Sequence, residues 1–376
     1  MTENSIVTGL YNALSAEQLP TRNIEALVGH FQHDRFFDLA VTQEGRKRKL
    51  KAHFSQGFNG RVFMTRRTLG RVEMPIPGLD IHYIEENALS SLSGDPVLRG
   101  AIVLVNNNDV IQNNSLDSYL DFFHRAEETI IAVWDFDNHH WYPMSTFLAA
   151  HSDIYFPTHP DYFSLLSRYN RTIAGPISAG VSQWSQSYLR ENFDNIVLTT
   201  RSDNPLGTHI FYEKFRFRNQ VVSTLGAQNP SVGFVTAGFH QMSAADRLRF
   251  WYTHKAHWIV PTLNDIPTRI FDALATGGIP IVPNTLKYHP EIDALAEHLV
   301  FFEASDLPSP QQVVAAANKK FDDGGVGKII ERHRLGTERH HASIRVAKML
   351  KIVMREFGID ALHIIPPPDA IRPSED

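Results

Sequence analysis

Short apolar runs alternate with longer segments of helical periodicity in two series along the chain, and this pattern constrains its fold most. Buried parallel strands are short apolar runs, and the helices that connect them repeat every 3.6 residues. The first series predicts strands at residues 36–41, 61–65, 81–84, 101–105, 130–134 and 154–157. The second predicts strands at residues 196–200, 232–236, 258–261, 279–282 and 299–302. We therefore expect an α/β protein with two Rossmann-like lobes facing a cleft.

The segment GPISAGVSQWSQS, residues 175–187, is rich in Gly, Ser and Pro and lies between the two series. Such a composition is typical of a connection, so we expect an N-terminal domain at residues 1–180 and a C-terminal domain at 181–345. A helical pattern over residues 341–357 precedes a proline-rich tail. Residues 346–376 are thus predicted to be a C-terminal helix and tail, with the helix crossing back to the N-terminal lobe.

Composition excludes several classes of protein. The formal net charge of −5 argues against general binding to nucleic acid, and the absence of cysteine excludes disulfides and thiolate metal sites. No basic start followed by an apolar core, and no run of about 18 apolar residues, is present in the sequence. These features predict a cytoplasmic protein.

The most informative stretch is NDIPTRIFDALATGGIPIVPNT, residues 264–285. Asp265 can cap a helix, Pro267 fits its first turn, and two glycines, Gly277 and Gly278, can end it before a short strand. At 100° per residue one polar stripe forms, which comprises Asp265, Thr268, Arg269, Asp272 and Thr276. For an arbitrary helix such a stripe would face water.

This stretch resembles the donor-site motif of GT-B glycosyltransferases, in which an Arg precedes an aromatic, an acidic residue, Ala-Leu-Ala, a glycine and a Pro-Val-like strand. It is also similar to the exostosin-like and spore-coat-type branches. The resemblance implies a GT-B enzyme that moves a sugar from a nucleotide-sugar donor to an acceptor hydroxyl, in bacterial surface polysaccharide or glycoconjugate synthesis. The C-terminal lobe would bind the donor and the N-terminal lobe a carbohydrate or glycolipid acceptor, with no metal or other cofactor.

The resemblance also implies roles for residues of the motif. Asp272 would contact hydroxyls of the donor ribose or sugar, and Asn264 and Asp272 stand where many retaining members carry two glutamates. Thr268 lies on the same stripe. Arg269 could meet a pyrophosphate or pair with a carboxylate of its own helix. The sequence leaves open the nucleotide, the sugar, the acceptor and whether the sugar's configuration is retained.

A metal-free transferase needs cations near the leaving diphosphate. Arg201 is expected at the carboxyl end of a strand, where open α/β sheets bind ligands, and His240 follows a second such strand. Lys214 opens the run KFRFR, in which strand alternation would turn the phenylalanines inward and Lys214, Arg216 and Arg218 outward. An amphipathic surface segment would show the same pattern.

In the N-terminal lobe, AVWDFDNHHWYP, residues 132–143, follows an apolar strand with two aspartates and two histidines. Asp135 and His140 are the candidates, either for the base that takes the proton of the acceptor hydroxyl or for binding of the donor phosphate in a retaining enzyme. A zinc site is not predicted, because no third ligand has a recognisable spacing. A capped turn with solvated side chains is the alternative for this segment.

Five of the six residues from Arg46 to Lys51 are cations. They could dock on an anionic membrane surface or acceptor, or form a solvated loop. Two other functions fit the same pattern of lobes. One is a nucleotide-sugar epimerase of the same fold, and the other is a nucleotide- or glycan-binding protein without chemistry.

Overall fold

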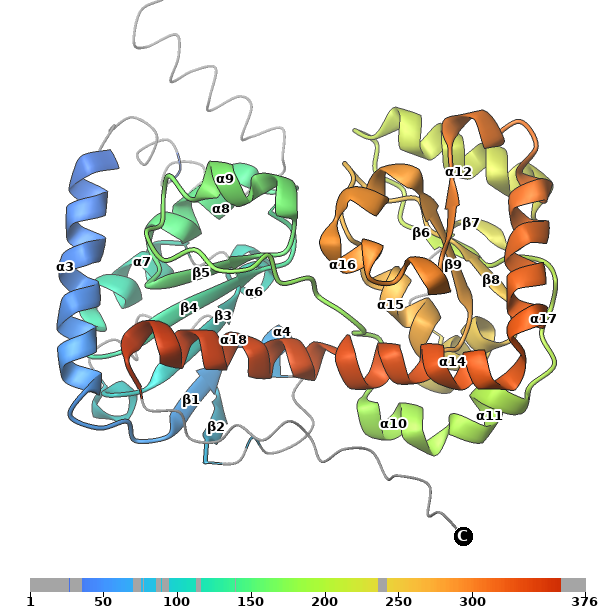
Figure 1. Ribbon diagram of the computed structural model, residues 1–376. Helices are drawn as coiled ribbons and strands as arrows, with labels where there is room; N and C mark the ends of the chain where they lie inside the picture. The colour runs from blue at the N-terminus through green and yellow to red at the C-terminus, as the bar shows by residue number, and fades with distance from the viewer. Residues whose placement is uncertain are drawn as a thin grey trace, which may run out of the picture. The chain divides into compact units, whose positions relative to one another are not determined.

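The computed structural model describes residues 27, 36–69, 76, 78–85, 89, 95–112, 116–138, 140–235 and 242–359. The chain divides into two compact units (Figure 1). Unit 1 comprises the described residues up to Ile177 and those from Val346, and unit 2 is Ser178–Arg345. The last helix, α18 (Ala342–Phe357), therefore starts in unit 2 and continues into unit 1. The α/β class, the two Rossmann-like units and the return of the C-terminal helix are confirmed.

The sheet of unit 1 has five parallel strands in the order β2-β1-β3-β4-β5. Every residue of β3, β4 and β5 is buried, which is why continuous apolar runs located them in the sequence. The strands are β1 (Arg61–Met64), β2 (Asp80–Tyr83), β3 (Ile102–Asn106), β4 (Ile130–Asp135) and β5 (Ile154–Pro157).

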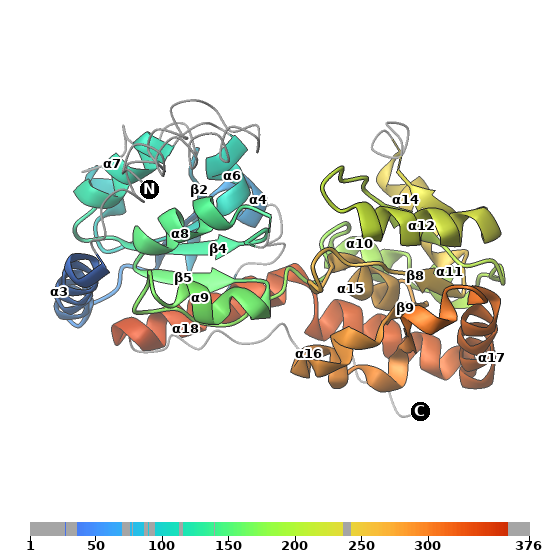
Figure 2. The ribbon, with the colours of Figure 1, turned by 90° about the horizontal axis from the view of Figure 1, so that it is seen from above.

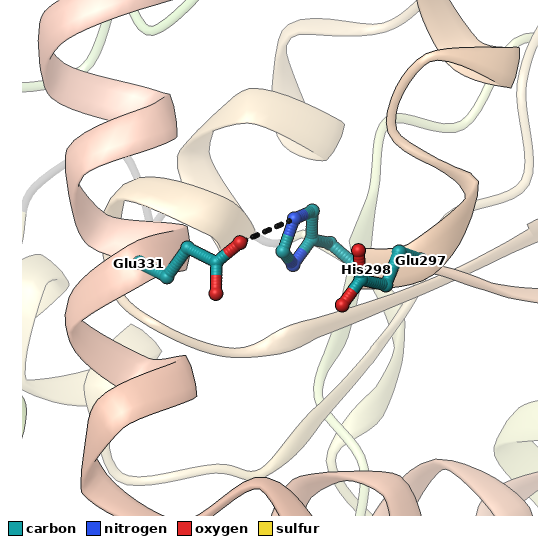
Figure 3. A group of neighbouring side chains, drawn as sticks. All are labelled: Glu297, His298 and Glu331. Carbon is teal, nitrogen blue, oxygen red and sulfur yellow. Dashed lines mark ion pairs between the residues drawn. The ribbon is translucent and has the colours of Figure 1, made fainter.

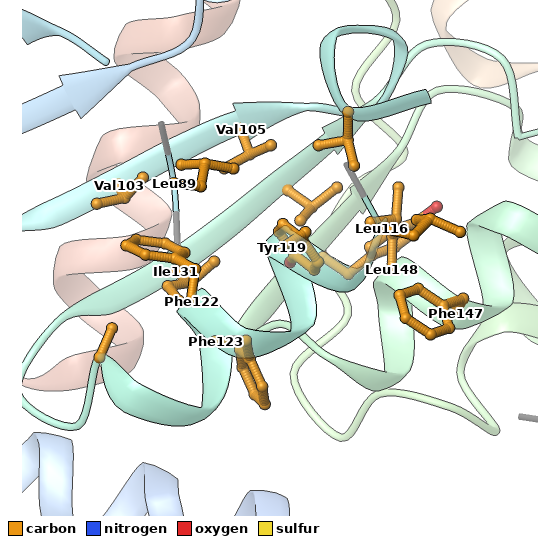
Figure 4. Close-up of a cluster of buried hydrophobic side chains, with 14 of the residues drawn as sticks. Leu89, Val103, Val105, Leu116, Tyr119, Phe122, Phe123, Ile131, Phe147 and Leu148 are labelled. Atoms are coloured by element: carbon orange, nitrogen blue, oxygen red, sulfur yellow. The ribbon is translucent and has the colours of Figure 1, made fainter. Parts of the chain in front are cut away.

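Two helices, α7 (Leu116–Arg125) and α8 (Tyr142–Ala150), cover one face of this sheet. Figure 4 shows their side chains packed on Val103, Val105 and Ile131 of the strands. The contacting residues of α7 recur at helical spacing, as Leu116, Tyr119, Phe122 and Phe123. The shorter helices of unit 1 are α4 (Arg66–Leu69), α6 (Asn107–Gln112) and α9 (Phe163–Leu166).

The strand predicted at residues 36–41 and the loop considered for Arg46 to Lys51 are wrong, because both lie in one helix, α3 (Phe36–Phe54). A short apolar run does not distinguish helix from strand, and the Lys, Arg, Glu, Gln and Leu residues that follow favour helix. Arg46 points inward and donates to Asp153 over 2.7 Å, and Lys47 pairs with Glu356. Arg48, Lys49 and Lys51 are exposed, and membrane contact through them stays a prediction.

Unit 2 contains a three-stranded sheet, β10-β9-β8, and a two-stranded sheet, β6-β7. A parallel bridge between Leu206 and His257 joins the two sheets, so the combined order is β7-β6-β8-β9-β10. Counted along the chain, this is the same order as in unit 1, with the second strand outside the first. The strands are β6 (Gly207–His209), β7 (Val232–Phe234), β8 (Ala256–Trp258), β9 (Ile279–Pro283) and β10 (Val300–Phe302).

Helices cover both faces of the sheet of unit 2. On one face α12 (Arg216–Gln228) and α17 (Pro310–Arg334) pack in one cluster with Trp258 and Ile281, and on the other face α14 (Ala244–Tyr252) packs with Ile259 and Val282; Figure 2 shows these helices around β8 and β9. The described residues of this unit also form α10 (Gln186–Glu191), α11 (Phe193–Leu198), α15 (Thr268–Ala275) and α16 (Pro290–Asp293). Among the helices that the structure describes, none has the length and apolar character needed to cross a membrane.

One strand of unit 2 was predicted in the wrong place. Residues 196–200 lie in and after α11, because Phe193, Ile196 and Val197 are spaced for the inner face of a helix. The first strand of the unit is instead β6, whose sequence Gly-Thr-His contains no apolar run. Apolar runs alone could therefore not locate it.

Candidate functional site

A pocket of about 1010 Å³ lies in unit 2 at the carboxyl ends of β8, β9 and β10. Pro283 pairs with Phe302 in the parallel register, which brings the loops after β9 and β10 together at this edge. The first turn of α12 and the loop after β8 complete the lining. The carboxyl edge, near the point where the strand order reverses, is where open α/β sheets bind ligands.

Helix α12 brings positive charge to the pocket. Lys214, Arg216 and Arg218 all line it, and the residue at the N-cap, Phe215, offers no side-chain cap to the first N–H groups. Arg216 is exposed and pairs with no carboxylate among the described residues. The end of a helix from which N–H groups project, flanked by arginines, favours an anionic ligand.

Arg218 is the most enclosed of these cations. It is 6% exposed, and it donates from Nε to the carbonyl of Val260 over 3.2 Å and from Nη1 to that of Ile210 over 2.8 Å. Its Nη2 is buried and has no hydrogen-bond partner among the residues that the structure describes. Burial lowers the pKa of Arg218 to about 10, so the side chain stays charged at neutral pH. A buried charge with an unfilled donor is costly unless an anion completes it.

His209 at the end of β6 supports the same corner of the pocket. It is fully buried, and its Nε2 accepts a hydrogen bond from the N–H of Val260 over 3.0 Å, so the proton resides on Nδ1. Burial and the charges of Arg269 and Arg218 lower its pKa well below the usual value. His209 and Arg218 thus tie the loop after β6 to the loop after β8.

His209 was not singled out from the sequence, and Arg218 was expected only as an outward-facing cation of the run at residues 214–218. The strand alternation expected for residues 214–218 is wrong, because α12 begins at Arg216 and turns Arg218 inward and Phe217 outward. The signal was present: Arg218, Val221, Val222 and Leu225 recur at helical spacing, and all four are buried.

Aromatic side chains form another part of the pocket lining. Phe217 of α12 is 74% exposed, and Tyr288, at the end of a short 3-10 helix (Asn284–Tyr288), is 84% exposed. Large exposed aromatics beside a pocket favour planar or apolar parts of a ligand. The apolar lining continues with Val260, Leu263, Phe302 and Leu307.

Asn264, predicted in the donor site, lines the pocket. Leu263 and Asn264 both have positive φ, 49° and 62°, a conformation that costs free energy for residues other than glycine and clusters at functional sites. Thr285 donates to the Asn264 side-chain oxygen over 2.6 Å, which fixes the amide against the loop after β9.

The other three predicted residues of the motif lie on α15, which begins at Thr268 with Pro267 at its N-cap. Thr268 is half-buried. Asp265 does not cap the helix, because its carboxylate accepts from the N–H of Thr262 instead. The polar stripe is not a water-facing one at its carboxyl end, because Asp272 and Thr276 are fully buried.

The Asp272 carboxylate accepts hydrogen bonds from the N–H of Ser182 over 3.3 Å and from Nε2 of Gln183 over 2.8 Å. Arg269 is half-buried, and no described residue accepts a hydrogen bond from its Nε. Burial lowers its pKa, and the charges of Asp265 and Asp272 oppose that shift. The attraction of these two carboxylates is what the pairing role requires, and neither Arg269 nor Asp272 lines the pocket.

Arg201 lies at the other edge of the sheet. Its guanidinium donates to the carbonyls of Ile196, Thr276 and His254 over 2.6, 2.8 and 3.2 Å. His254 precedes β8 and Thr276 precedes β9, so these carbonyls mark the amino ends of the strands. The prediction that Arg201 follows the carboxyl end of a strand is wrong, because the segment that precedes it is helical. His240, also predicted, lies outside the described residues.

In unit 1, Asp135 ends β4 and is fully buried. Its carboxylate accepts from the hydroxyls of Ser145 and Tyr155 and from the N–H of Asp137, 3.0 Å away. Burial raises the pKa of Asp135 to about 6, against the effect of these hydrogen bonds. His140 is half-buried, and its backbone N–H donates to the Asp137 carbonyl over 2.8 Å.

One group among the described residues has the composition of a metal site: Glu297, His298 and Glu331, whose ligand atoms lie within 4.8 Å of one another (Figure 3). His298 Nε2 lies 3.4 Å from Glu331. Lys328 pairs with both carboxylates, at 2.8 Å from Glu331. The ammonium group already supplies the positive charge that a cation would bring, so the cluster is an ion-pair network.

Comparison with known proteins identifies no family. No family model matches the chain, and no curated protein matches it. Among solved structures, it is similar to the catalytic domain of starch synthase IV from Arabidopsis thaliana bound to ADP and acarbose. The two chains are 10% identical, the match covers 75% of this chain and 83% of the other, and the TM-score is 0.45. This similarity establishes neither an activity nor a ligand.

Proposed function

We propose that this protein is a glycosyltransferase whose nucleotide-sugar donor binds in the pocket of unit 2. One observation carries the proposal: Arg218 lines a large pocket beside the N-terminus of α12, and its buried Nη2 has no partner in the described part of the chain. A diphosphate supplies the anion that this corner lacks. The two Rossmann-like units and the motif at residues 264–285 support the same enzyme class.

The pocket offers contacts for both the diphosphate and the base of a nucleoside diphosphate. Lys214, Arg216 and Arg218 would hold the diphosphate, and Phe217 and Tyr288 would contact the base. The same cations would stabilise the charge that develops on the diphosphate as the bond to the sugar breaks. Asn264, fixed at the pocket wall, would contact the donor.

The acceptor would be a carbohydrate or glycolipid of surface polysaccharide or glycoconjugate synthesis, bound by unit 1. We propose His140 as the base that takes the proton of the acceptor hydroxyl as the new glycosidic bond forms. Asp135, the second candidate from the sequence, is enclosed and has three partners, so a direct role would require it to become accessible.

The test is release of nucleoside diphosphate from a panel of nucleotide sugars, with and without oligosaccharide and glycolipid acceptors. Acceptor-dependent release supports a transferase. A change in the donor's sugar without acceptor would instead show an epimerase, and binding without turnover of any donor would show a binding protein. Either of the last two results overturns the proposal.

A further inference from the structure

Away from the cations of α12, the pocket contains one acidic group. Of the described residues that line the pocket, Glu303 alone is acidic, and it follows β10 directly. Asn284, which follows β9, donates from Nδ2 to Oε1 of Glu303 over 3.2 Å. The register of the strands places the two side chains together, because Pro283 pairs with Phe302.

Glu303 has hydrogen-bonding capacity to spare. Its carboxylate accepts from Asn284 and from the backbone at Asp306, in a capping box at the start of a short 3-10 helix (Ala304–Asp306). Two carboxylate oxygens offer about four acceptor positions, so about two remain. No cation pairs with Glu303 within the described part of the chain, and the residue is exposed.

Electrostatics decides which part of a ligand can lie beside this carboxylate. A phosphate would be repelled by Glu303 and attracted by the arginines of α12. Uncharged hydroxyls, in contrast, can donate to the carboxylate, and a vicinal diol can donate twice. The 2′- and 3′-hydroxyls of a ribose form such a diol.

The acidic residue of the motif, Asp272, is placed differently. It is fully buried, and Ser182 and Gln183 donate to its two oxygens. Glu303 is therefore the carboxylate that the pocket offers to a ligand.

We propose that Glu303, held by Asn284, recognises the ribose hydroxyls of the donor, so that the pocket takes ribonucleotides and discriminates against 2′-deoxyribonucleotides. This inference rests on the proposed function, because it assumes a nucleotide in the pocket. The 2′-hydroxyl is the group that the site recognises. A 2′-deoxyribose has no hydroxyl there to donate to the Glu303 carboxylate.

Calorimetric titration of UDP, GDP and ADP against their 2′-deoxy counterparts tests the inference. The wild-type protein should bind the ribonucleotide about 10-fold or more tightly, as expected for a hydrogen bond to a charged group. Glu303→Gln should reduce that ratio severalfold without weakening the binding of inorganic pyrophosphate, which the carboxylate repels. Glu338→Gln, at an exposed acid outside the pocket lining, is the matched control and should keep the wild-type ratio.

Equal affinity for ribo- and deoxyribonucleotides would overturn the inference and leave the proposed function standing. A normal ratio in a folded Glu303→Gln protein, with an unchanged melting temperature, would also overturn it. Failure of all the diphosphates to bind would instead refute the proposed function itself. Asn284→Ala gives a second check, since release of the Glu303 carboxylate should lower the ratio without loss of pyrophosphate binding.

Discussion

Arg218 donates from its Nε to the carbonyl oxygen of Val260, 3.2 Å away, and so joins the first turn of α12 to the loop after β8. The two segments lie more than forty residues apart in the sequence and both line the pocket. The Nη2 of the same guanidinium is buried and finds no partner within the described ranges of the chain. One side chain therefore both builds the pocket and leaves a donor for its ligand.

Arg216→Ala should weaken nucleoside diphosphate binding about 10-fold without changing the melting temperature. The side chain is exposed and has no carboxylate partner among the described residues, so its loss removes a phosphate contact and little else. Calorimetric titration measures the effect. Arg249→Ala, at an exposed arginine of α14 outside the pocket lining, is the control. Equal affinities for the two variants would place the phosphates elsewhere.

Gly278→Ala should destabilise unit 2 by roughly 1–3 kcal/mol, the usual cost of overpacking. A Cβ atom there would lie 2.4 Å from Nε2 of His257, whose ring is stacked on Trp251 and is not free to move. Gly233→Ala in β7 is the matched control, because a Cβ there meets nothing within 4 Å. Urea denaturation compares the two, and similar midpoints would contradict the packing described.

The sequence predicted most strands because their apolar runs are buried on both faces, as in β3, β4 and β9. It failed where an element lacks such a run or where a run belongs to a helix. β6 contains only Gly-Thr-His, and the run at residues 196–198 ends α11. In both segments tertiary packing, and not the local sequence pattern, determined the secondary structure.

The residues of the candidate site were also predicted only in part, because some of them are placed by tertiary contacts and not by local sequence pattern. The motif placed Asn264 in the donor region, and the structure places it on the pocket wall. His209 was not recognised, and Arg218 was expected to point outward, because the roles of both depend on a contact of each with Val260, far away in the sequence. Arg201 was expected at a strand end that does not exist, since a helix precedes it.

Asp135→Asn should flatten part of the pH dependence of stability. Burial raises the folded pKa of Asp135 to about 6 from 3.8, so its stabilising effect is complete below pH 3.8 and is lost as the pH rises through 6. The shift corresponds to about 3 kcal/mol. Urea denaturation from pH 4 to 8 should show a smaller loss of stability for the variant than for the wild type. Parallel curves would contradict the buried state of this carboxyl.

Glu291→Gln should change the pH dependence of the free energy of unfolding at acidic pH. Burial raises the pKa of Glu291, but the hydrogen bond from His340 and the charge of Arg345 outweigh it and lower the pKa to about 2 from 4.5. The stabilisation is present above pH 4.5 and is lost as the pH falls through 2, to a total of about 3 kcal/mol. The variant should be less stable at pH 7 and closer to the wild type at pH 2.5. A difference in stability between the two proteins that does not change with pH would contradict the interaction of Glu291 with His340 and Arg345.

Titration of UDP, GDP, ADP, CMP and TDP into the whole protein tests the central claim most directly. We predict that at least one nucleoside diphosphate binds at a single site per chain, competes with inorganic pyrophosphate and binds about 10-fold more weakly to Arg216→Ala. No binding of any of these nucleotides at about 1 mM, or binding that Arg216→Ala leaves unchanged, would contradict a donor site in this pocket.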